Sequence, residues 1–199
     1  MSKVNRAVIF IADGTEEIEA TVTVDVLRRA GIEVLVCGVS IEKVPYYTCS
    51  RGLKIVPDSI LDFDPINFDT FNAVIIPGGL EGSKILSEND QVQRILADFY
   101  AQGKVVATIC AGCLAIKTAK LFNKKGVKLS ITGHPSVKNQ LKDDFDFLSD
   151  RVVSDNHLIT ASGPGASFEF AFEIVKRMTG IENARAVAAP MLLNFVVDE

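Results

Sequence analysis

The chain has 199 residues, 48% of them hydrophobic, which predicts a single folded domain spanning 1–199 with a sizeable core. Its formal net charge is -4 and it has no Lys/Arg run or basic stripe, so nucleic acid is not an expected partner. No apolar run approaches the ~18–20 residues that cross a bilayer, and the N-terminal stretch does not fit a secretory signal, so we expect no membrane partner and a cytoplasmic location, with nuclear entry left open.

The first half of the chain alternates short apolar runs with longer amphipathic ones, and Gly or Pro marks most junctions. The first amphipathic run opens with acidic residues and closes with Arg28, Arg29 and Gly31, as expected for a helix. The predicted elements are, in chain order, a strand at 6–12, a helix at 16–31, a strand at 33–39, a strand, turn and strand at 44–58, and a loop at 59–69.

The second half continues this alternation. The predicted elements are a strand at 72–79, a helix at 83–102, a strand at 104–109 that runs into a helix at 111–121, a strand at 127–135, a hairpin at 151–161 and a final helix at 167–180. Strands of continuous Val and Ile, each followed by a helix, indicate a parallel sheet that is covered on both faces. We therefore predict a doubly wound, flavodoxin-like α/β fold with a mostly parallel sheet.

In such a fold, ligands bind at the carboxyl ends of the strands. Four segments follow predicted strands there: "ADGTEE" (12–17), "PGG" (77–79), "ICAG" (109–112) and "GHP" (133–135). Each carries reactive or conformationally permissive residues, so the sequence predicts a site where these four segments meet.

Cys110 and Cys113 form a Cys-x-x-Cys pair at the start of a predicted helix, an arrangement used in disulfide exchange. The flanking sequence lacks the aromatic residue and the proline typical of thioredoxin-like motifs, which disfavours that chemistry. A zinc site is disfavoured too, because Cys37 and Cys49 are isolated and the chain has only two histidines. We therefore expect no metal.

We favour a third interpretation, in which Cys110 is a nucleophile at the apex of a strained strand-to-helix turn, with Gly112 permitting a close approach. Such a turn would present an exposed thiol of low pKa. The backbone N–H groups of Ala111 and of the Gly78 and Gly79 segment would then form an oxyanion hole. Cys113, one turn on, is expected to pack in the core.

Glu19 lies on the apolar side of the first predicted helix, where a carboxyl group is costly unless it is protonated or has a partner. Desolvation should raise its pKa, so it could donate or shuttle a proton for a nearby sulfur. Complementing the helix dipole explains Glu17 well and Glu16 plausibly, but explains Glu19 poorly.

Two further side chains are candidates for the site. His134 follows a predicted strand and precedes a proline, so it could act as an acid or a base. Arg51 could bind a carboxylate or carbonyl oxygen, or could be a surface charge. His157 lies in the predicted hairpin turn and is expected to be exposed and inert, and Cys49 is expected to pack.

Seven segments together resemble the ThiJ/PfpI superfamily and, more narrowly, its parkinsonism-associated DJ-one branch. The resemblance runs in order from about residue 6 to 190, nearly the whole chain. The segments are "GTEEIEA" (14–20), "VDVLRRAGI" (24–32), "CSR" (49–51), "PGG" (77–79), "ICAG" (109–112), "HP" (134–135) and "GPGASFEFA" (163–171).

The resemblance implies a homodimer in which Cys110 is the reactive cysteine, hydrogen-bonded to a protonated Glu19, with His134 nearby and with Gly79 and Ala111 at the oxyanion site. The sequence departs from the family at two positions. Ser162 stands where relatives often carry an Arg that joins the Arg51-like residue in an anion pocket. Cys113 is not a usual family feature and leaves open a disulfide with Cys110 under oxidation.

The resemblance also implies activity as a glutathione-independent glyoxalase (glyoxalase III, also called lactate dehydratase), as a protein deglycase or as an oxidative-stress sensor. We expect the conversion of methylglyoxal to lactate through a hemithioacetal on Cys110, with glyoxal as a related substrate and no cofactor. The alternatives are a cysteine-based redox sensor or chaperone, and a deglycase that uses the same residues.

Overall fold

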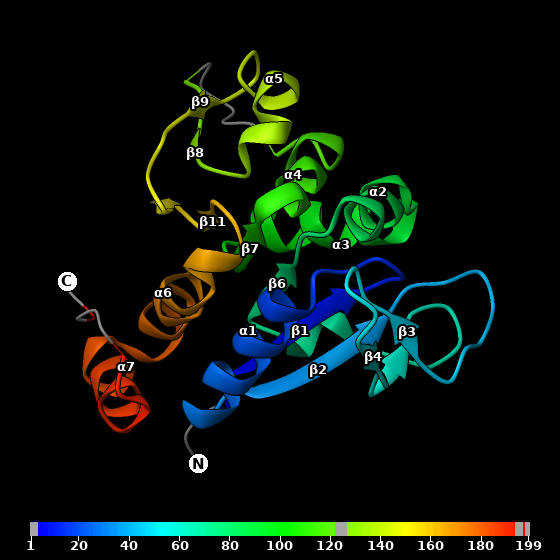
Figure 1. The fold of residues 1–199 in the computed structure, drawn as a ribbon, viewed down its shortest axis with the longest axis horizontal. Coiled ribbons are helices and arrows are strands. Elements are labelled where there is room, and N and C mark those ends of the chain that lie inside the picture. Colours follow the sequence, from blue (N-terminus) through cyan, green and yellow to red (C-terminus); the bar gives the residue numbers. More distant parts are fainter. Residues whose placement is uncertain (1–3, 122–126, 194–196, 198–199) are drawn as a thin grey trace.

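The computed structural model of the protein describes residues 4–121, 127–193 and 197. Its main feature is a seven-stranded sheet in the order β10-β11-β7-β6-β1-β2-β5, shown in Figure 1. All neighbouring pairs are parallel except β10 and β11. The strands are β1 (Arg6–Ile11), β2 (Glu33–Gly38), β5 (Ser59–Ile60), β6 (Ala73–Ile76), β7 (Val105–Ile109), β10 (Val152–Asp155) and β11 (Leu158–Ala161).

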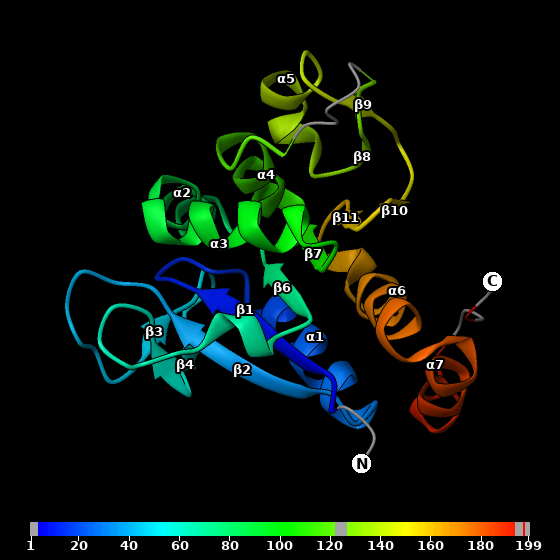
Figure 2. The same ribbon diagram turned by 180° about the vertical axis from the view of Figure 1, so that it is seen from behind.

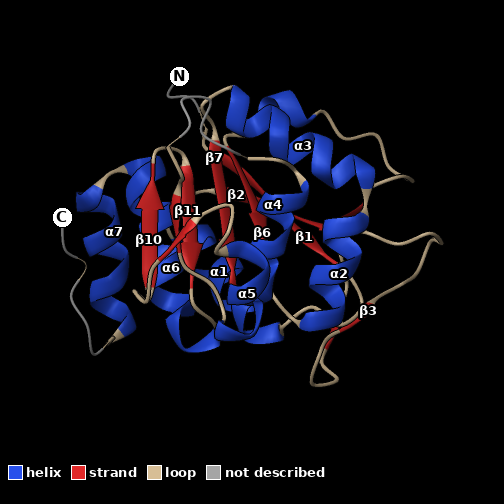
Figure 3. Cartoon of the chain, turned by 90° about the horizontal axis from the view of Figure 1, so that it is seen from above, coloured by secondary structure: helices blue, strands red, loops and turns tan. Residues whose placement is uncertain are grey.

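Helices cover both faces of this sheet. Helices α1 and α6 pack against each other on one face (Figure 1), and α3 covers the other (Figure 2). Viewed from above, the strands run between these two layers (Figure 3). The helices are α1 (Glu17–Arg29), α2 (Leu80–Glu88), α3 (Asp90–Ala101), α4 (Leu114–Thr118), α5 (Lys138–Leu141), α6 (Ser167–Thr179) and α7 (Ile181–Ala188).

The central strands β1, β6 and β7 are almost wholly buried, as expected for a parallel sheet covered on both faces. Two short pairs lie outside the main sheet, namely antiparallel β3 (Tyr47–Thr48) with β4 (Lys54–Ile55), and parallel β8 (Ser130–Ile131) with β9 (Asp146–Phe147). The predicted doubly wound, mostly parallel α/β fold is confirmed.

Strand order also locates the topological switch point. From β1 the chain builds outward through β2 and β5, then returns to place β6 on the other side of β1 and continues through β7 to β11. The carboxyl ends of β1 and β6 therefore flank the crevice where ligands bind in open α/β sheets.

The helix predicted at 83–102 is wrong as a single element, because two helices, α2 and α3, meet at Asn89. The Asn89 side chain accepts hydrogen bonds from the N–H groups of Gln91 and Val92, both at 3.0 Å, which caps α3. An Asn side chain that bonds nearby backbone N–H groups ends one helix and caps the next. The apolar periodicity runs across this break, so the periodicity alone predicted one helix.

Other predicted boundaries also change. The helix predicted at 111–121 begins as a 3₁₀ turn, Cys110–Cys113, before α4, and the loop predicted at 59–69 contains the short strand β5. The strand predicted at 127–135 is reduced to β8, while α7 has no counterpart among the predicted elements. No helix in the described part of the chain combines the length and hydropathy required to traverse a bilayer.

Candidate active site

Cys110 follows β7 immediately and has a left-handed backbone with φ of 61°, unusual for a residue other than glycine. The predicted strained turn is therefore confirmed. Two glycines permit it: a Cβ on Gly112 would lie 2.6 Å from the Pro77 carbonyl oxygen, and one on Gly78 would lie 2.7 Å from the Cys110 Cβ. The β6 and β7 ends thus approach more closely than larger residues would allow.

Glu19 projects from α1 into this crevice and is wholly buried, so its predicted place on the apolar side is confirmed. Its Oε2 accepts a hydrogen bond of 2.6 Å from the Gly78 N–H. The other oxygen, Oε1, is buried without a nitrogen or oxygen partner among the described residues, and the Cys110 thiol lies beside this carboxyl group.

Burial raises the pKa of Glu19 to about 7; hydrogen bonds from Gly78 and Cys110 oppose this rise, and the nearby Glu16 charge adds to it. At neutral pH the carboxyl group is therefore poised between its protonated and ionised forms. Such a group can accept a proton in one step of a reaction and return it in another.

The expectation of an exposed thiol with a low pKa is wrong. Cys110 is only 9% exposed, and burial, together with the adjacent Glu19 charge, raises the pKa of its thiol to about 12. Sequence reasoning considered the turn and the helix start but not the loss of water around the sulfur. A thiol with this pKa could react as a thiolate at neutral pH only if a neighbour took its proton, and the Glu19 carboxyl group is adjacent.

The predicted oxyanion donors divide into two groups. The Ala111 N–H lies at the Cys110 sulfur and lowers its pKa, so it points to where an adduct would form. Gly79 caps the start of α2 beside this turn. The expectation that Gly78 is an oxyanion donor is wrong, because its N–H already donates to Glu19. Its carbonyl accepts the Glu16 N–H at 2.9 Å. Gly78 therefore holds the acid and is not a free donor.

His134 reaches the site through its backbone. Its N–H donates to the Cys110 carbonyl at 3.3 Å, so the 132–134 segment packs on the Cys110 turn. The side chain is exposed, and its Nδ1 accepts the Ser136 N–H at 3.2 Å. The same Nδ1 lies 2.8 Å from the Ser136 hydroxyl; a neutral ring that accepts the Ser136 N–H at Nδ1 carries its proton on Nε2, where it can be donated.

Arg51 is exposed, and its guanidinium donates to the Ser50 carbonyl at 3.2 Å. Within the described residues no contact joins its side chain to Cys110 or Glu19, so the structure does not bring it into the site. Ser162 follows β11 directly, and its N–H donates to the Arg151 carbonyl at 2.9 Å. The guanidinium of that Arg151 is bound to the Gly165 carbonyl and to Glu169.

Glu17 is a residue whose role the sequence reasoning missed. Its carboxylate accepts hydrogen bonds from the Ser50 hydroxyl at 2.8 Å and from the Arg51 N–H at 2.9 Å, and approaches the Leu53 N–H at 3.5 Å. Burial alone would raise the pKa of Glu17, but these hydrogen bonds lower it overall. Glu17 thus anchors the β3–β4 turn to α1. From the sequence, its place in the first helical turn indicated only a favourable interaction with the helix dipole.

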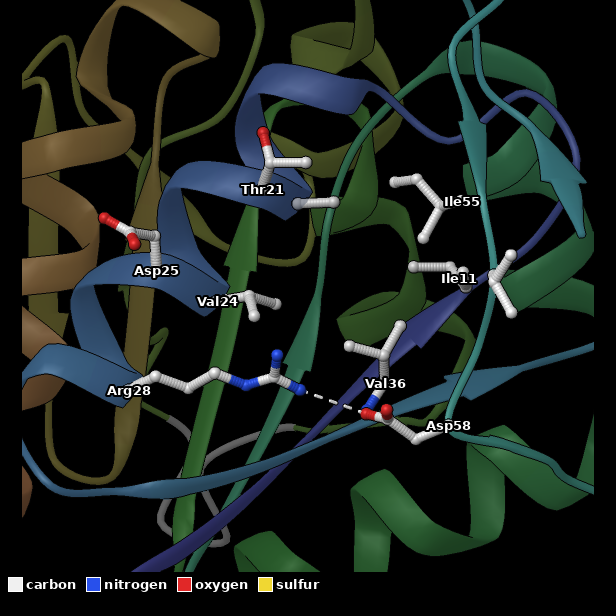
Figure 4. A pocket seen from close by; sticks show the side chains of 10 residues that line it. Ile11, Thr21, Val24, Asp25, Arg28, Val36, Ile55 and Asp58 are labelled. Carbon is white, nitrogen blue, oxygen red and sulfur yellow. Dashed lines mark hydrogen bonds and ion pairs between the residues drawn. The ribbon is translucent and has the colours of Figure 1, made fainter.

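A separate cavity of about 300 Å³ lies away from Cys110, between α1 and β1, β2 and β4 (Figure 4). Apolar side chains of the three strands form its wall, and Arg28 and Asp58 pair at 3.1 Å at its edge. The exposed apolar residues Ile18, Leu53 and Val56 belong to the same elements, α1 and the β3–β4 hairpin with its flanks. In the described part of the chain no cluster of three metal-binding side chains occurs.

Comparison with known proteins supports the resemblance over most of the chain. The model of the DJ-1/PfpI family matches residues 5–177. The chain is 40% identical over 190 residues to the Parkinson disease protein 7 homolog of Danio rerio, covering 94% of this chain and 97% of that protein. It is 34% identical over 184 residues to a Schizosaccharomyces pombe protein named glutathione-independent glyoxalase DJ-1, covering 90% and 94%.

The solved structure of Schizosaccharomyces pombe DJ-1 has a TM-score of 0.86 to this fold at 31% identity, covering 94% of this chain and 99% of that one. The family resemblance inferred from the motifs is therefore confirmed.

Burial of Glu19 predicts that stability depends on pH. Its pKa is about 7 in the folded chain and 4.5 ordinarily, so the folded state binds the proton more tightly. Protonated Glu19 therefore adds about 3 kcal/mol to the free energy of unfolding. This contribution is complete below the pKa of the unfolded chain, 4.5, and is lost as the pH rises through 7. In urea titrations, the difference between wild type and Glu19→Gln should fall by about that amount from pH ~4 to pH ~8. A difference that stays constant would contradict a carboxyl group held neutral by burial.

The Glu17 anchor predicts a local effect. Glu17→Gln weakens the charge-assisted bonds to the turn, so we expect the free energy of unfolding to fall by about 1 kcal/mol. Amide hydrogen exchange at Arg51 and Leu53 should accelerate. Glu42→Gln makes the same charge change at an exposed position and is the control. Equal protection of the turn in both variants would rule out the anchor.

Proposed function

The chain belongs to the DJ-1/PfpI family, and from that premise we propose that it is a glutathione-independent glyoxalase of the glyoxalase III, or lactate dehydratase, type. Its substrate would be methylglyoxal, converted to lactate, with glyoxal as a second substrate. Relatives at 34–35% identity carry the name glutathione-independent glyoxalase. The observation that carries the proposal is the buried pair of a thiol and a carboxyl group whose pKa lies near 7.

In the first step, the Cys110 sulfur bonds to the aldehyde carbon while its proton passes to the Glu19 carboxylate. The aldehyde oxygen becomes an alkoxide, which the Ala111 and Gly79 N–H groups would stabilise before Glu19 returns the proton to it. The product is a neutral hemithioacetal and Glu19 is again a carboxylate. A thiol with a raised pKa fits this step, because the thiolate is needed only when the substrate is present.

In the second step, Glu19 removes the proton from the former aldehyde carbon, and that electron pair forms the double bond of an enediol. The Nε2–H of His134 would protonate the neighbouring ketone oxygen. Glu19 then returns its proton to the second carbon while the first hydroxyl gives its proton back to His134. The result is a thioester of lactate on Cys110, an isomerisation with no net change in oxidation state.

In the third step, water attacks the thioester carbon and the carbon–sulfur bond breaks. The sulfur recovers a proton and lactate leaves, so the overall reaction adds one water to methylglyoxal. Each step uses only thiol, carboxyl, imidazole and backbone N–H groups, so the proposed reaction requires no metal or organic cofactor.

A redox sensor or a deglycase would use the same sulfur. Burial of Cys110 and its raised pKa favour turnover, because peroxide reacts with the thiolate, which is scarce here without a bound substrate. Deglycation needs access for a protein-bound adduct, and a cysteine residue that is only 9% exposed favours a small free dicarbonyl.

We further propose that the chain acts as a cytoplasmic homodimer. Three exposed apolar side chains, Ile18, Leu53 and Val56, which we call the apolar face, support this, and Val56 also lines the cavity of Figure 4. Val56 is 72% exposed and Ile18 and Leu53 are each 50% exposed, an apolar grouping that a second copy could cover.

The activity test uses pure protein and methylglyoxal without glutathione, with lactate followed by NMR. Cys110→Ser should lose all measurable turnover, and Glu19→Gln should lose about 100-fold in kcat because its amide cannot relay a proton. Cys49→Ser changes a buried cysteine elsewhere and serves as the control. Full activity in either Cys110→Ser or Glu19→Gln would exclude the mechanism.

The dimer test places a charge on the apolar face. Val56→Asp should convert the wild-type dimer to a monomer in light scattering, because a carboxylate would be buried at the contact. Ile41→Asp makes a similar change at a side chain that is 97% exposed and outside this face, so it should stay dimeric. A dimeric Val56→Asp would place the interface elsewhere.

A further inference from the structure

Cys113 has a role that the proposed reaction does not use. Its thiol is fully buried; it accepts a hydrogen bond from the Thr108 hydroxyl at 3.2 Å and donates to the Thr132 carbonyl at 3.2 Å, and the Ala161 backbone N–H also bonds the sulfur. One sulfur therefore joins β7, the turn after it and the segment that leads to His134. This pattern of defined polar partners is more than passive core packing requires.

The Cys110 and Cys113 sulfurs lie on opposite flanks of β7. The Cys110 sulfur lies beside Gly78, at the end of β6. The Cys113 sulfur lies beside Thr132, whose N–H is held by the β11 hydroxyl of Thr160 at 2.9 Å. Since β6 and β11 are the two neighbours of β7 in the sheet, the two thiols contact segments on different sides of that strand.

The Thr132–His134 segment is seated closely on Cys113. A Cβ on Gly133 would lie 3.3 Å from both the Cys113 sulfur and the Cys110 carbonyl oxygen, so there is little slack between segment and turn. The next N–H, that of His134, donates to that same Cys110 carbonyl. The contact of Cys113 with Thr132 thus lies two residues from the imidazole and one turn from the nucleophile.

We propose that Cys113 is a positioning residue, which fixes the His134 segment against the Cys110 turn through the Thr132 carbonyl and does not act as a resolving cysteine for Cys110. The inference rests on the proposed function for its kinetic consequence but not for its structural one. Loss of the thiol donor would let the 132–134 segment move and would misplace the imidazole.

The kinetic test compares Cys113→Ala, which removes the donor, with Cys113→Ser, which keeps one. Cys113→Ala should lower kcat about 10-fold with KM changed less than about 2-fold, and Cys113→Ser should recover most of that loss. Cys37→Ala empties a similar volume at a fully buried cysteine in β2 and controls for lost packing. Equal kcat values for Cys113→Ala and Cys37→Ala would overturn the proposal.

A second measurement is independent of any activity. The chain has only two histidines, His134 and His157, so their ring signals can be assigned with His157→Gln. Cys113→Ala should shift the His134 ring resonances and leave those of His157 in place, while Cys113→Ser and Cys37→Ala should leave both. Unmoved His134 signals in Cys113→Ala would refute positioning. If the His134 signals shift as expected but the wild-type protein forms no lactate, only the proposed glyoxalase activity is refuted.

A third measurement addresses resolving chemistry. Hydrogen peroxide oxidises a thiol to a sulfenic acid and is reduced to water; a resolving cysteine then forms a disulfide and releases a second water, a net loss of two hydrogens. Because the Cys110 thiolate is scarce without substrate, peroxide treatment is extended until oxidation is detected; peptide masses should then show oxygen added at Cys110, with Cys113 still free to be alkylated once the protein is denatured. A Cys110–Cys113 disulfide would contradict the proposal.

Discussion

The buried contact between Glu19 and the Cys110 thiol is the constraint on which the rest of the site depends. A carboxyl group without water is stable only when it is neutral or hydrogen-bonded, and this one takes a single backbone N–H from Gly78. The same burial that raises its pKa to about 7 also keeps the neighbouring sulfur protonated. The Cys110 sulfur is therefore a thiol in the free protein, and the proposed reaction has to couple its deprotonation by Glu19 to the binding of a substrate.

Three acidic residues at the start of α1, the N-cap Glu16 and the helical Glu17 and Glu19, have different roles because each meets a different neighbour. The Glu16 side chain accepts the Glu19 N–H at 2.8 Å and caps the helix. Glu17 turns outward and holds the β3–β4 turn, and Glu19 turns inward to the end of β6. One short stretch thus fixes the helix start, a neighbouring loop and the acid of the site.

The end of β7 shows a similar division of roles. Cys110 is directed to β6, where the acid lies, and Cys113 is directed to Thr132, which leads to His134. The two cysteines of this turn thus contact segments on the two sides of β7. This arrangement follows from the strand order, since β6 and β11 border β7 on either side.

Local pattern in the sequence was enough to predict the doubly wound sheet, the carboxyl-end site, the strained turn at Cys110 and the inward side of Glu19, because strand alternation and helical periodicity fix which way side chains face. Only the tertiary structure decided which groups meet there. In the folded chain the Gly78 N–H donates to Glu19, and the Glu17 carboxylate accepts the Arg51 N–H. Burial removes water from the Cys110 sulfur, which raises the pKa of its thiol. Such contacts join segments tens of residues apart, and the water they exclude depends on every element packed around them.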